Sequence, residues 1–412
     1  MAIIILFCDW SDLPVLCARP VHLIGLYIYT SKKNSFYSSH MLWRISLTGL
    51  LTYLFLCRIF RYRRLKNTIR KYKNVPLDYH KAQDISLITS LYEMPYMMQL
   101  SVSFALFKTY GIPTISRLLA KTNQLARLEV AGRRAEDTGV LLAECFLHDL
   151  DSERARMGLA RINYLHSLYR TSISNDDMLY TLSLFVLEPA RWAERLEWRS
   201  LSNLEKEARH IFLKEIGERM GIESIPTTFA AFENWSTDYE TKSMIYSEDN
   251  KICGEATLSF MILVYPKLMH GFLRKFFIAL VDERLRLAMG FEEVPSWMKV
   301  FVKTVFNVRA FLLRHCTLPR IFPEYLGQNH GGTVNEHGRY NRPGYLFEPW
   351  YVKETPVNQW CPFIQKRPGS QYKSHGFTVS ELGPEKFAGK GVDIMEKDAE
   401  KMKERAISQA NY

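Results

Sequence analysis

The side chain best suited to hold a buried metal is the imidazole of His166. In the segment RARMGLARINYLHSLYR, the residues Ala155, Leu159, Ile162, His166 and Tyr169 follow one another at intervals of four, three, four and three. This spacing places them on one apolar helical face. A neutral imidazole there could be an axial ligand of a buried metal or haem. It could also be a core histidine that is hydrogen-bonded to a backbone carbonyl, and periodicity alone favours this second interpretation.

A second polar group lies on the preceding predicted helix, residues 133–149. Arg134 and Thr138 are four residues apart and therefore share a helical face, with Asp137 next to Thr138. Burying such groups is costly unless each finds a partner. Taken alone, the pattern favours a polar contact between helices in which each group has a hydrogen-bond partner, or a solvated charge cluster.

The sequence lacks the short motifs of several large enzyme classes. It contains no GxGxxG, GxxxxGK[ST], GxSxG or HExxH pattern, so a nucleotide-dependent or serine-hydrolase function finds no support. The 7 cysteines are scattered without a CxxC pair, which disfavours a zinc ribbon, a thioredoxin site and a dense disulfide framework. Reduced thiols on a protein facing the cytosol fit this pattern better.

Helices must position these residues. The chain is 47% hydrophobic and 24% charged, far from the composition of a disordered protein. Several segments show the 3.6-residue spacing of helices, with N-cap signals at Ser174 and Ser202. We expect the helix after Ser174 to end at Pro189. The sequence therefore predicts an all-α fold, with a helical domain over residues 81–325.

The two ends of the chain differ from this domain. Residues 326–412 begin with Gly, Pro, Asn and aromatic residues and end in a charged, helix-favouring tail. We expect a loop-rich segment draped over the body and a solvent-exposed tail. Residues 1–41 form an uncertain extension, which could be a second weak span, a re-entrant piece or an upstream extension of the gene model with Met41 as the start.

An apolar segment, residues 42–60, is followed by a basic one, residues 61–80. The first is about as long as a helix that crosses a hydrocarbon core of roughly 30 Å. Residues 58–73 carry 8 Lys or Arg and no acidic residue, and the net charge of the whole chain is +11. The positive-inside rule then predicts a single-pass anchor with the body in the cytosol. A nucleic-acid binder would usually spread its basic residues over a folded face, so we expect no nucleic-acid partner.

Several longer runs of the sequence resemble one family. The runs are TYGIPTISRLLAKT (109–122), RRAEDTGVLLAECF (133–146), RINYLHSLYR (161–170), ISNDDMLYTLSLFVLEPARWAERLEWRSLS (173–202) and LKEIGERMGI (213–222). They resemble the fungal oxygenases of the MpaB type, which are bound to the endoplasmic reticulum and named for mycophenolic acid biosynthesis. That family is similar to the bacterial latex-clearing rubber oxygenases. The resemblance covers residues 85–325 and the anchor with its basic collar.

The resemblance implies a globin-like helical core that binds haem b and has a transmembrane helix before it. It implies a membrane enzyme of secondary metabolism that cleaves a carbon–carbon double bond of an isoprenoid or prenylated lipophilic small molecule with O2. By position, His166 would be the axial ligand of the haem iron, and Arg134 and Thr138 would lie in the haem pocket. Arg134 could also pair with a haem propionate.

The resemblance leaves the other catalytic residues less defined. The rubber enzymes have a lysine where this chain has Asp137, so Asp137 could instead accept a proton or anchor bound oxygen, together with Arg134. We find no match for their catalytic glutamate. Glu93 and Glu144 are candidates only because their sequence surroundings are apolar.

Two alternatives stay open. A non-catalytic, membrane-anchored helical protein of the same fold could bind a lipid or serve as a scaffold for a pathway enzyme, and the loss of the lysine favours it. A non-haem iron enzyme would need two histidines and a carboxylate at one site. His148, His210 and His270 are present, but none stands at ligand spacing from another. Neither the substrate nor a protein partner can be named.

Overall fold

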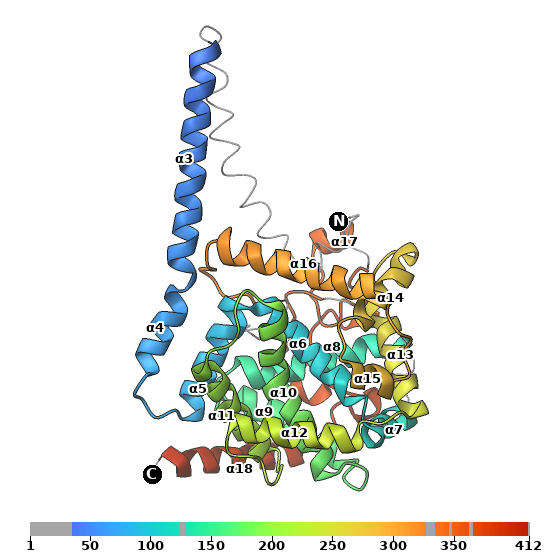
Figure 1. Cartoon of the computed structure of the whole chain (residues 1–412). Coiled ribbons are helices and arrows are strands. Elements are labelled where there is room, and N and C mark those ends of the chain that lie inside the picture. Colours follow the sequence, from blue (N-terminus) through green and yellow to red (C-terminus); the bar gives the residue numbers. More distant parts are fainter. Residues whose placement is uncertain (1–34, 123–127, 327–333, 346–347, 362–365, 411–412) are drawn as a thin grey trace.

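The computed structural model describes residues 35–122, 128–326, 334–345, 348–361 and 366–410 of the chain. Every regular element within these ranges is a helix, which confirms the all-α fold class (Figure 1). Two isolated bridges, Tyr340 with Phe377 and Arg342 with Val352, pair extended pieces of the C-terminal segment. The globin-like binding of haem stays a prediction.

The body consists of helices packed around α10. In chain order, the helices of the body are α5 (Tyr79–Ile88), α6 (Pro95–Thr109), α7 (Pro113–Thr122), α8 (Leu128–Leu147), α9 (Glu153–Ser167), α10 (Asn175–Leu196), α11 (Asn203–Arg219), α12 (Phe229–Ser243), α13 (Glu248–Ile262), α14 (His270–Ile278), α15 (Glu283–Ala288) and α16 (Ser296–His315). A π-helical turn, η1 (Thr89–Glu93), joins α5 to α6, and a short helix, η2 (Lys267–Met269), precedes α14. Helix α10 contacts α6, α11, α12 and α16, and its side chains contribute to both large hydrophobic clusters.

The predicted helix starts are confirmed by their caps. The Ser174 side chain accepts a hydrogen bond from the backbone N–H of Asp177 at the start of α10. At the start of α11, Ser202 and Glu205 form a complete capping box. Each cap satisfies backbone donors that the first helical turn leaves without a partner.

The predicted end of the helix at Pro189 is wrong, because α10 continues to Leu196. A proline inside a helix leaves the carbonyl four residues earlier without its N–H donor. Here that carbonyl belongs to Phe185, and the Nε of Arg209 on α11 donates a hydrogen bond to it at 2.9 Å. The neighbouring helix therefore replaces the missing donor and allows α10 to run through the proline.

The C-terminal segment covers one side of α8 and α9. Its elements are α17 (Pro356–Trp360), the short helices η3 (Ser370–Tyr372), η4 (Val379–Glu381) and η5 (Glu385–Phe387), and α18 (Val392–Ala410). Arg161 of α9 is fully buried and donates hydrogen bonds to the backbone carbonyls of Leu382, Phe387 and Lys390 at 2.8–2.9 Å. This one side chain therefore binds the segment to the body at three points.

Helix α18 packs along α9 and only part of it is exposed. Met395, Ala399 and Met402 are buried, at intervals of four and three that place them on one helical face. The expected solvent-exposed tail is therefore correct for the charged face alone. A narrow apolar stripe within a charged sequence is enough to dock the helix.

The anchor projects from the body as α3 (Ser35–Arg61) and continues into α4 (Arg63–Tyr72). Trp43–Tyr72 is the one helical stretch of the described residues long and apolar enough to cross a membrane. The expected span, residues 42–60, overlaps this stretch. The expected extension, residues 1–41, lies mostly outside the described residues. At the base of the anchor, Arg64 pairs with Glu93 of the body at 3.0 Å.

Candidate functional site

Helices α8 and α9 are antiparallel neighbours that position the predicted site residues. The connection between them is short, and the Ser152 side chain caps α9 by accepting a hydrogen bond from the N–H of Ala155. Gly158 allows a close crossing, because a Cβ there would lie 2.9 Å from the Cβ of Glu144. The early turns of α8 therefore lie beside the last turns of α9, and this end of the pair carries Arg134, Thr138 and His166.

His166 is half-buried, and its imidazole makes no hydrogen bond to a described residue; its Nδ1 is buried without a partner. The hydrogen bond to a backbone carbonyl that a core histidine would make is therefore not formed. Burial, followed by the nearby cation of Arg134, lowers the pKa of His166 to about 4. The ring is neutral at physiological pH, the form that can bind a metal.

Arg134 is held in place by Thr138. The Nη1 of Arg134 donates a hydrogen bond to the Thr138 hydroxyl, and that hydroxyl donates to the Arg134 carbonyl at 2.7 Å. Among the described side chains, no carboxylate forms a salt bridge with Arg134. A half-buried arginine without a counter-ion, fixed by its neighbour, is suited to pairing with an anionic ligand.

A tyrosine that the sequence analysis did not single out faces the same region. Tyr110, at the C-terminal end of α6, is half-buried. Burial raises its pKa to about 12, with the nearby Arg134 acting in the opposite direction. Tyr110 and His166 are both strongly desolvated, yet both keep some accessible surface. Both side chains lie near Arg134, whose charge acts on the pKa of each.

Asp137 lies on the other side of α8, where the C-terminal segment covers it. Its side chain is fully buried; one oxygen accepts a hydrogen bond from the Tyr351 hydroxyl and the other from the Gly383 N–H at 2.9 Å. Burial raises its pKa, which these partners and Arg133 oppose. A direct role on bound oxygen stays a prediction, and the contacts are those of a residue that holds the C-terminal segment.

The two glutamates proposed as catalytic candidates are buried and ion-paired. Glu93 lies 3.0 Å from Arg64 and 3.4 Å from Arg199, at the base of the anchor. Glu144 accepts a hydrogen bond from Arg154 at 2.8 Å, and although burial raises its pKa, Arg154 opposes this effect. Apolar sequence surroundings identified both as buried, but gave no information on these arginine partners.

His210 of α11 is a second buried imidazole without a partner. It is 2% exposed, and neither ring nitrogen has a hydrogen-bond partner. Burial, followed by the Lys214 cation, lowers its pKa to about 4. The ring packs edge-on against Phe232, with centroids 5.9 Å apart. Sequence reasoning considered His210 only for its spacing to other histidines and missed its isolation, which makes it the natural control for His166.

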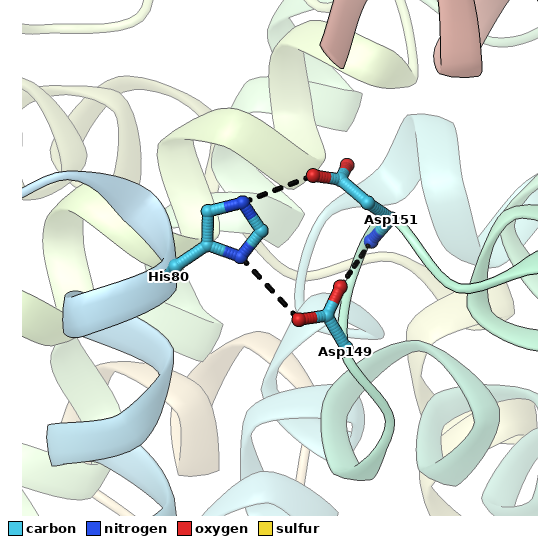
Figure 2. A group of neighbouring side chains, drawn as sticks. All are labelled: His80, Asp149 and Asp151. Atoms are coloured by element: carbon cyan, nitrogen blue, oxygen red, sulfur yellow. Dashed lines mark hydrogen bonds and ion pairs between the residues drawn. The ribbon is translucent and has the colours of Figure 1, made fainter. Parts of the chain in front are cut away.

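At the opposite end of the helix pair, His80 of α5 lies beside Asp149 and Asp151 of the connection between α8 and α9 (Figure 2). The His80 Nε2 lies 3.0 Å from Asp151 and its Nδ1 3.4 Å from Asp149. Arg219 also pairs with Asp151, at 2.7 Å. Within the described ranges, this is the one group of three such side chains close enough to share a metal ion. It lacks the second histidine of a non-haem iron site, and its charges are already paired, so we assign no metal to it.

Comparison with known proteins points to oxygenases. Residues 114–312, which include Arg134, Thr138 and His166, match the model of a family described as ER-bound oxygenase mpaB/B'/Rubber oxygenase, catalytic domain. The chain is 34% identical over 399 residues to the ER-bound oxygenase mpaB' of Penicillium brevicompactum, covering 89% of this chain and 93% of that protein. It is 35% identical over 264 residues to the ER-bound oxygenase mpaB of Penicillium roqueforti, covering 59% and 89% of the two chains.

Proposed function

Because this chain belongs to the family of ER-bound mpaB-type oxygenases and rubber oxygenases, we propose that it is a haem-dependent oxygenase that cleaves a carbon–carbon double bond. Family membership makes it an oxygenase. The substrate that we propose is an isoprenoid or prenylated lipophilic small molecule. We propose a single span in the endoplasmic reticulum membrane with the body in the cytosol, which the basic residues after the apolar part of α3 support.

The observation that carries the haem proposal is an imidazole beside an arginine, neither of which has a hydrogen-bonding or ionic partner on another helix or segment of the described residues. The unpartnered imidazole of His166 and the neutral state of the ring fit a residue that would hold the iron of a haem. Arg134, fixed by Thr138, fits the partner of a haem propionate. When bound there, haem would supply the redox-active iron that dioxygen chemistry on an alkene requires.

The residues of the candidate site have different proposed roles. His166 would hold the iron, and its lowered pKa of about 4 keeps the ring nitrogen free of a proton at physiological pH. Tyr110, with a pKa of about 12, stays protonated and can donate a hydrogen bond to a bound ligand. We keep Arg134 as the catalytic candidate, because its charge acts on both His166 and Tyr110. We propose that Asp137 acts as a positioning residue, through its contacts to Tyr351 and Gly383.

The test is an absorption spectrum and a pyridine haemochrome assay of the full-length protein in detergent. We expect a Soret band and about one haem b per chain. His166→Ala should lose the band while the helix content measured by circular dichroism stays unchanged, and His210→Ala should keep the haem. In His166→Gly, added imidazole should restore the band by replacing the missing ligand.

Each other outcome points to a different conclusion. Normal haem content in His166→Ala would overturn the assignment, and loss only in His210→Ala would move the ligand to α11. Folded wild-type protein with iron but no Soret band would favour a non-haem enzyme. Folded protein without any metal, even when expressed with ample haem, would favour the non-catalytic scaffold. Bond cleavage itself is tested by oxygen-dependent formation of carbonyl products from prenylated compounds, and products at the anaerobic level would contradict it.

A further inference from the structure

The apolar part of α3 is too short to cross a membrane above the body. The Tyr53 hydroxyl donates a hydrogen bond to the Cys316 carbonyl at 3.1 Å, and Cys57 is fully buried. Apolar residues clear of the body are therefore confined to Leu42–Thr52, which span about 16 Å at about 1.5 Å per residue. A hydrocarbon core is about 30 Å thick, and residues 35–40 (SFYSSH), which precede Met41, are mostly polar. The lower part of the span, down to Phe60, must lie at the depth of the upper body.

Helix α16 lies at this depth. It crosses the upper side of the body at the level of the lower end of α3 (Figure 1). One helical face packs inward through the buried residues Met298, Val302 and Phe306. The opposite face exposes large apolar side chains, with Val300 64% and Phe311 58% exposed. The other exposed apolar residues of this face and of the segment after it are Trp297, Val308, Leu312, Leu318, Ile321 and Phe322.

The charges of this region suit the surface of a membrane. Helix α16 contains no acidic residue, and Lys299, Lys303 and Arg314 flank its apolar face. Long basic side chains can reach the headgroups while their stems lie against apolar surface, and anionic lipids attract such helices. A soluble surface would rarely expose so many neighbouring large apolar side chains.

A cavity beside α3 shows the same change from apolar to basic lining. It has a volume of about 580 Å³ and lies between α3, α4 and the segment after α16. Leu56, Phe60 and Leu318 line it along α3 and this segment, whereas Arg63 and Lys71 line it along α4. The change coincides with the passage from α3 into α4, as expected where a chain leaves the acyl region and enters the headgroups.

We propose that the outer face of α16, together with residues 318–322, inserts into the headgroup–acyl boundary of the leaflet from which α3 emerges. The partner of this face is the phospholipid bilayer, and the body is held to the membrane at two places rather than by the anchor alone. The proposal requires the anchor to enter a membrane, but it does not depend on haem or on the reaction catalysed.

The test measures depth in the full-length protein, reconstituted in vesicles of phosphatidylcholine and phosphatidylserine. Cys8, Cys17, Cys316 and Cys361 are replaced by Ser; this keeps the backbone carbonyl of residue 316 to which Tyr53 bonds. A nitrobenzoxadiazole fluorophore is attached in turn to the variants Phe311→Cys, Val300→Cys and, as the matched control on the exposed face of α18, Ile407→Cys. Leu50→Cys on α3 reports that the anchor is inserted.

The fluorophores are challenged with nitroxide-labelled lipid and with aqueous iodide. We expect nitroxide lipid to quench the labels at 300 and 311 at least about twofold more than the label at 407, with the opposite order for iodide. Quenching at 300 and 311 by iodide but not by nitroxide lipid would overturn the proposal, because the face would then be in water. Quenching by neither would also overturn it, because a protein partner or a second copy would cover the face.

Discussion

The two sides of the α8–α9 pair both bury polar groups, but they treat them differently. On the side covered by the C-terminal segment, Arg161 donates to three backbone carbonyls and Asp137 accepts from Tyr351 and Gly383. On the other side, the Nδ1 of His166 has no partner and Arg134 has no described counter-ion. The first pattern is that of a structural contact, and the second is that of a site completed by a ligand.

The contrast teaches that the partners of a polar residue indicate its role better than its type or burial does. Asp137 and Arg134 are three residues apart on one helix, and the resemblance suggested catalytic roles for both. Their surroundings separate them, because Asp137 is hydrogen-bonded to Tyr351 and Gly383 of the C-terminal segment, whereas Arg134 lies near the unpartnered imidazole of His166. The predictions that follow test this separation.

The largest effect on stability is expected from Arg161→Met. The change would leave the buried carbonyls of Leu382, Phe387 and Lys390 without donors, at a cost of about 3–5 kcal/mol in the free energy of unfolding. Chemical denaturation of the detergent-solubilised protein measures this cost. The matched control is Arg156→Met on the same helix, because Arg156 donates to one described carbonyl, that of Ala399, at 3.1 Å. Equal losses in the two variants would show that the C-terminal segment is not fastened by Arg161.

The second prediction concerns pH and separates the two unpartnered imidazoles. His210 has a folded pKa of about 4, below the usual value of about 6.5, so between these values the unfolded chain binds the proton and the folded chain does not. Stability is therefore full above about pH 6.5 and declines as the pH falls towards 4. His210→Leu should remove up to about 3 kcal/mol of this decline without changing haem content.

The measurement is the difference between the unfolding free energies of wild type and His210→Leu at each pH, in which the contributions of other groups cancel. A constant difference between pH 7 and 4 would mean that His210 titrates in the folded protein as it does in the unfolded chain. A loss of haem would mean that His210 belongs to the same kind of site as His166, and the contrast between a ligand site and a core histidine would fail.

A smaller effect is expected from Asp137→Asn. The amide keeps the shape of the side chain but loses one of the two acceptor oxygens, and we expect a loss of about 1–2 kcal/mol in unfolding free energy with unchanged haem content. Turnover should fall only modestly. A fall of 100-fold or more in turnover, with stability and haem near those of wild type, would instead support a direct role as a proton acceptor. Tyr351→Phe in a double-mutant cycle reports whether the two residues are coupled.

The smallest effect is expected from Thr138→Val. Removing the hydroxyl frees the Arg134 guanidinium, and we expect haem affinity to fall about fivefold, which corresponds to about 1 kcal/mol. Titration of the haem-free protein with haem measures it, and Thr138→Ser should restore most of the affinity because it keeps the hydroxyl. A Ser variant as weak as the Val variant would show that the methyl group, rather than the hydrogen bond, is what matters.

Features that depend on neighbouring residues could be predicted from the sequence. The caps at Ser174 and Ser202 and the common end of α8 and α9 that carries Arg134, Thr138 and His166 follow from spacing along single helices and a short connection. What the sequence missed depends on contacts across the fold. The partner of Asp137 is Tyr351, which lies 214 positions away, and the donor that lets α10 pass Pro189 comes from Arg209 on the next helix.

Packing also decided which apolar stripes are covered. The short stripe of α18, with Met395 and Met402, finds α9 and is buried, whereas the stripe of α16 that includes Phe311 stays open. Both stripes have helical spacing. The charged residues of α18 predicted a solvent-exposed helix, but its apolar face is buried against α9. Spacing identifies an amphipathic helix, but the three-dimensional arrangement selects its neighbour.

The fastening by Arg161 has a consequence for how relatives of this protein can be recombined. The stretch recognised as the catalytic domain ends at residue 312, but the carbonyls that receive Arg161 belong to residues 382, 387 and 390. A chimaera that exchanged the recognised stretch alone would pair the arginine of one parent with the closing segment of the other. The unit that folds together is therefore larger than the recognised stretch, and a productive graft must carry both pieces of chain.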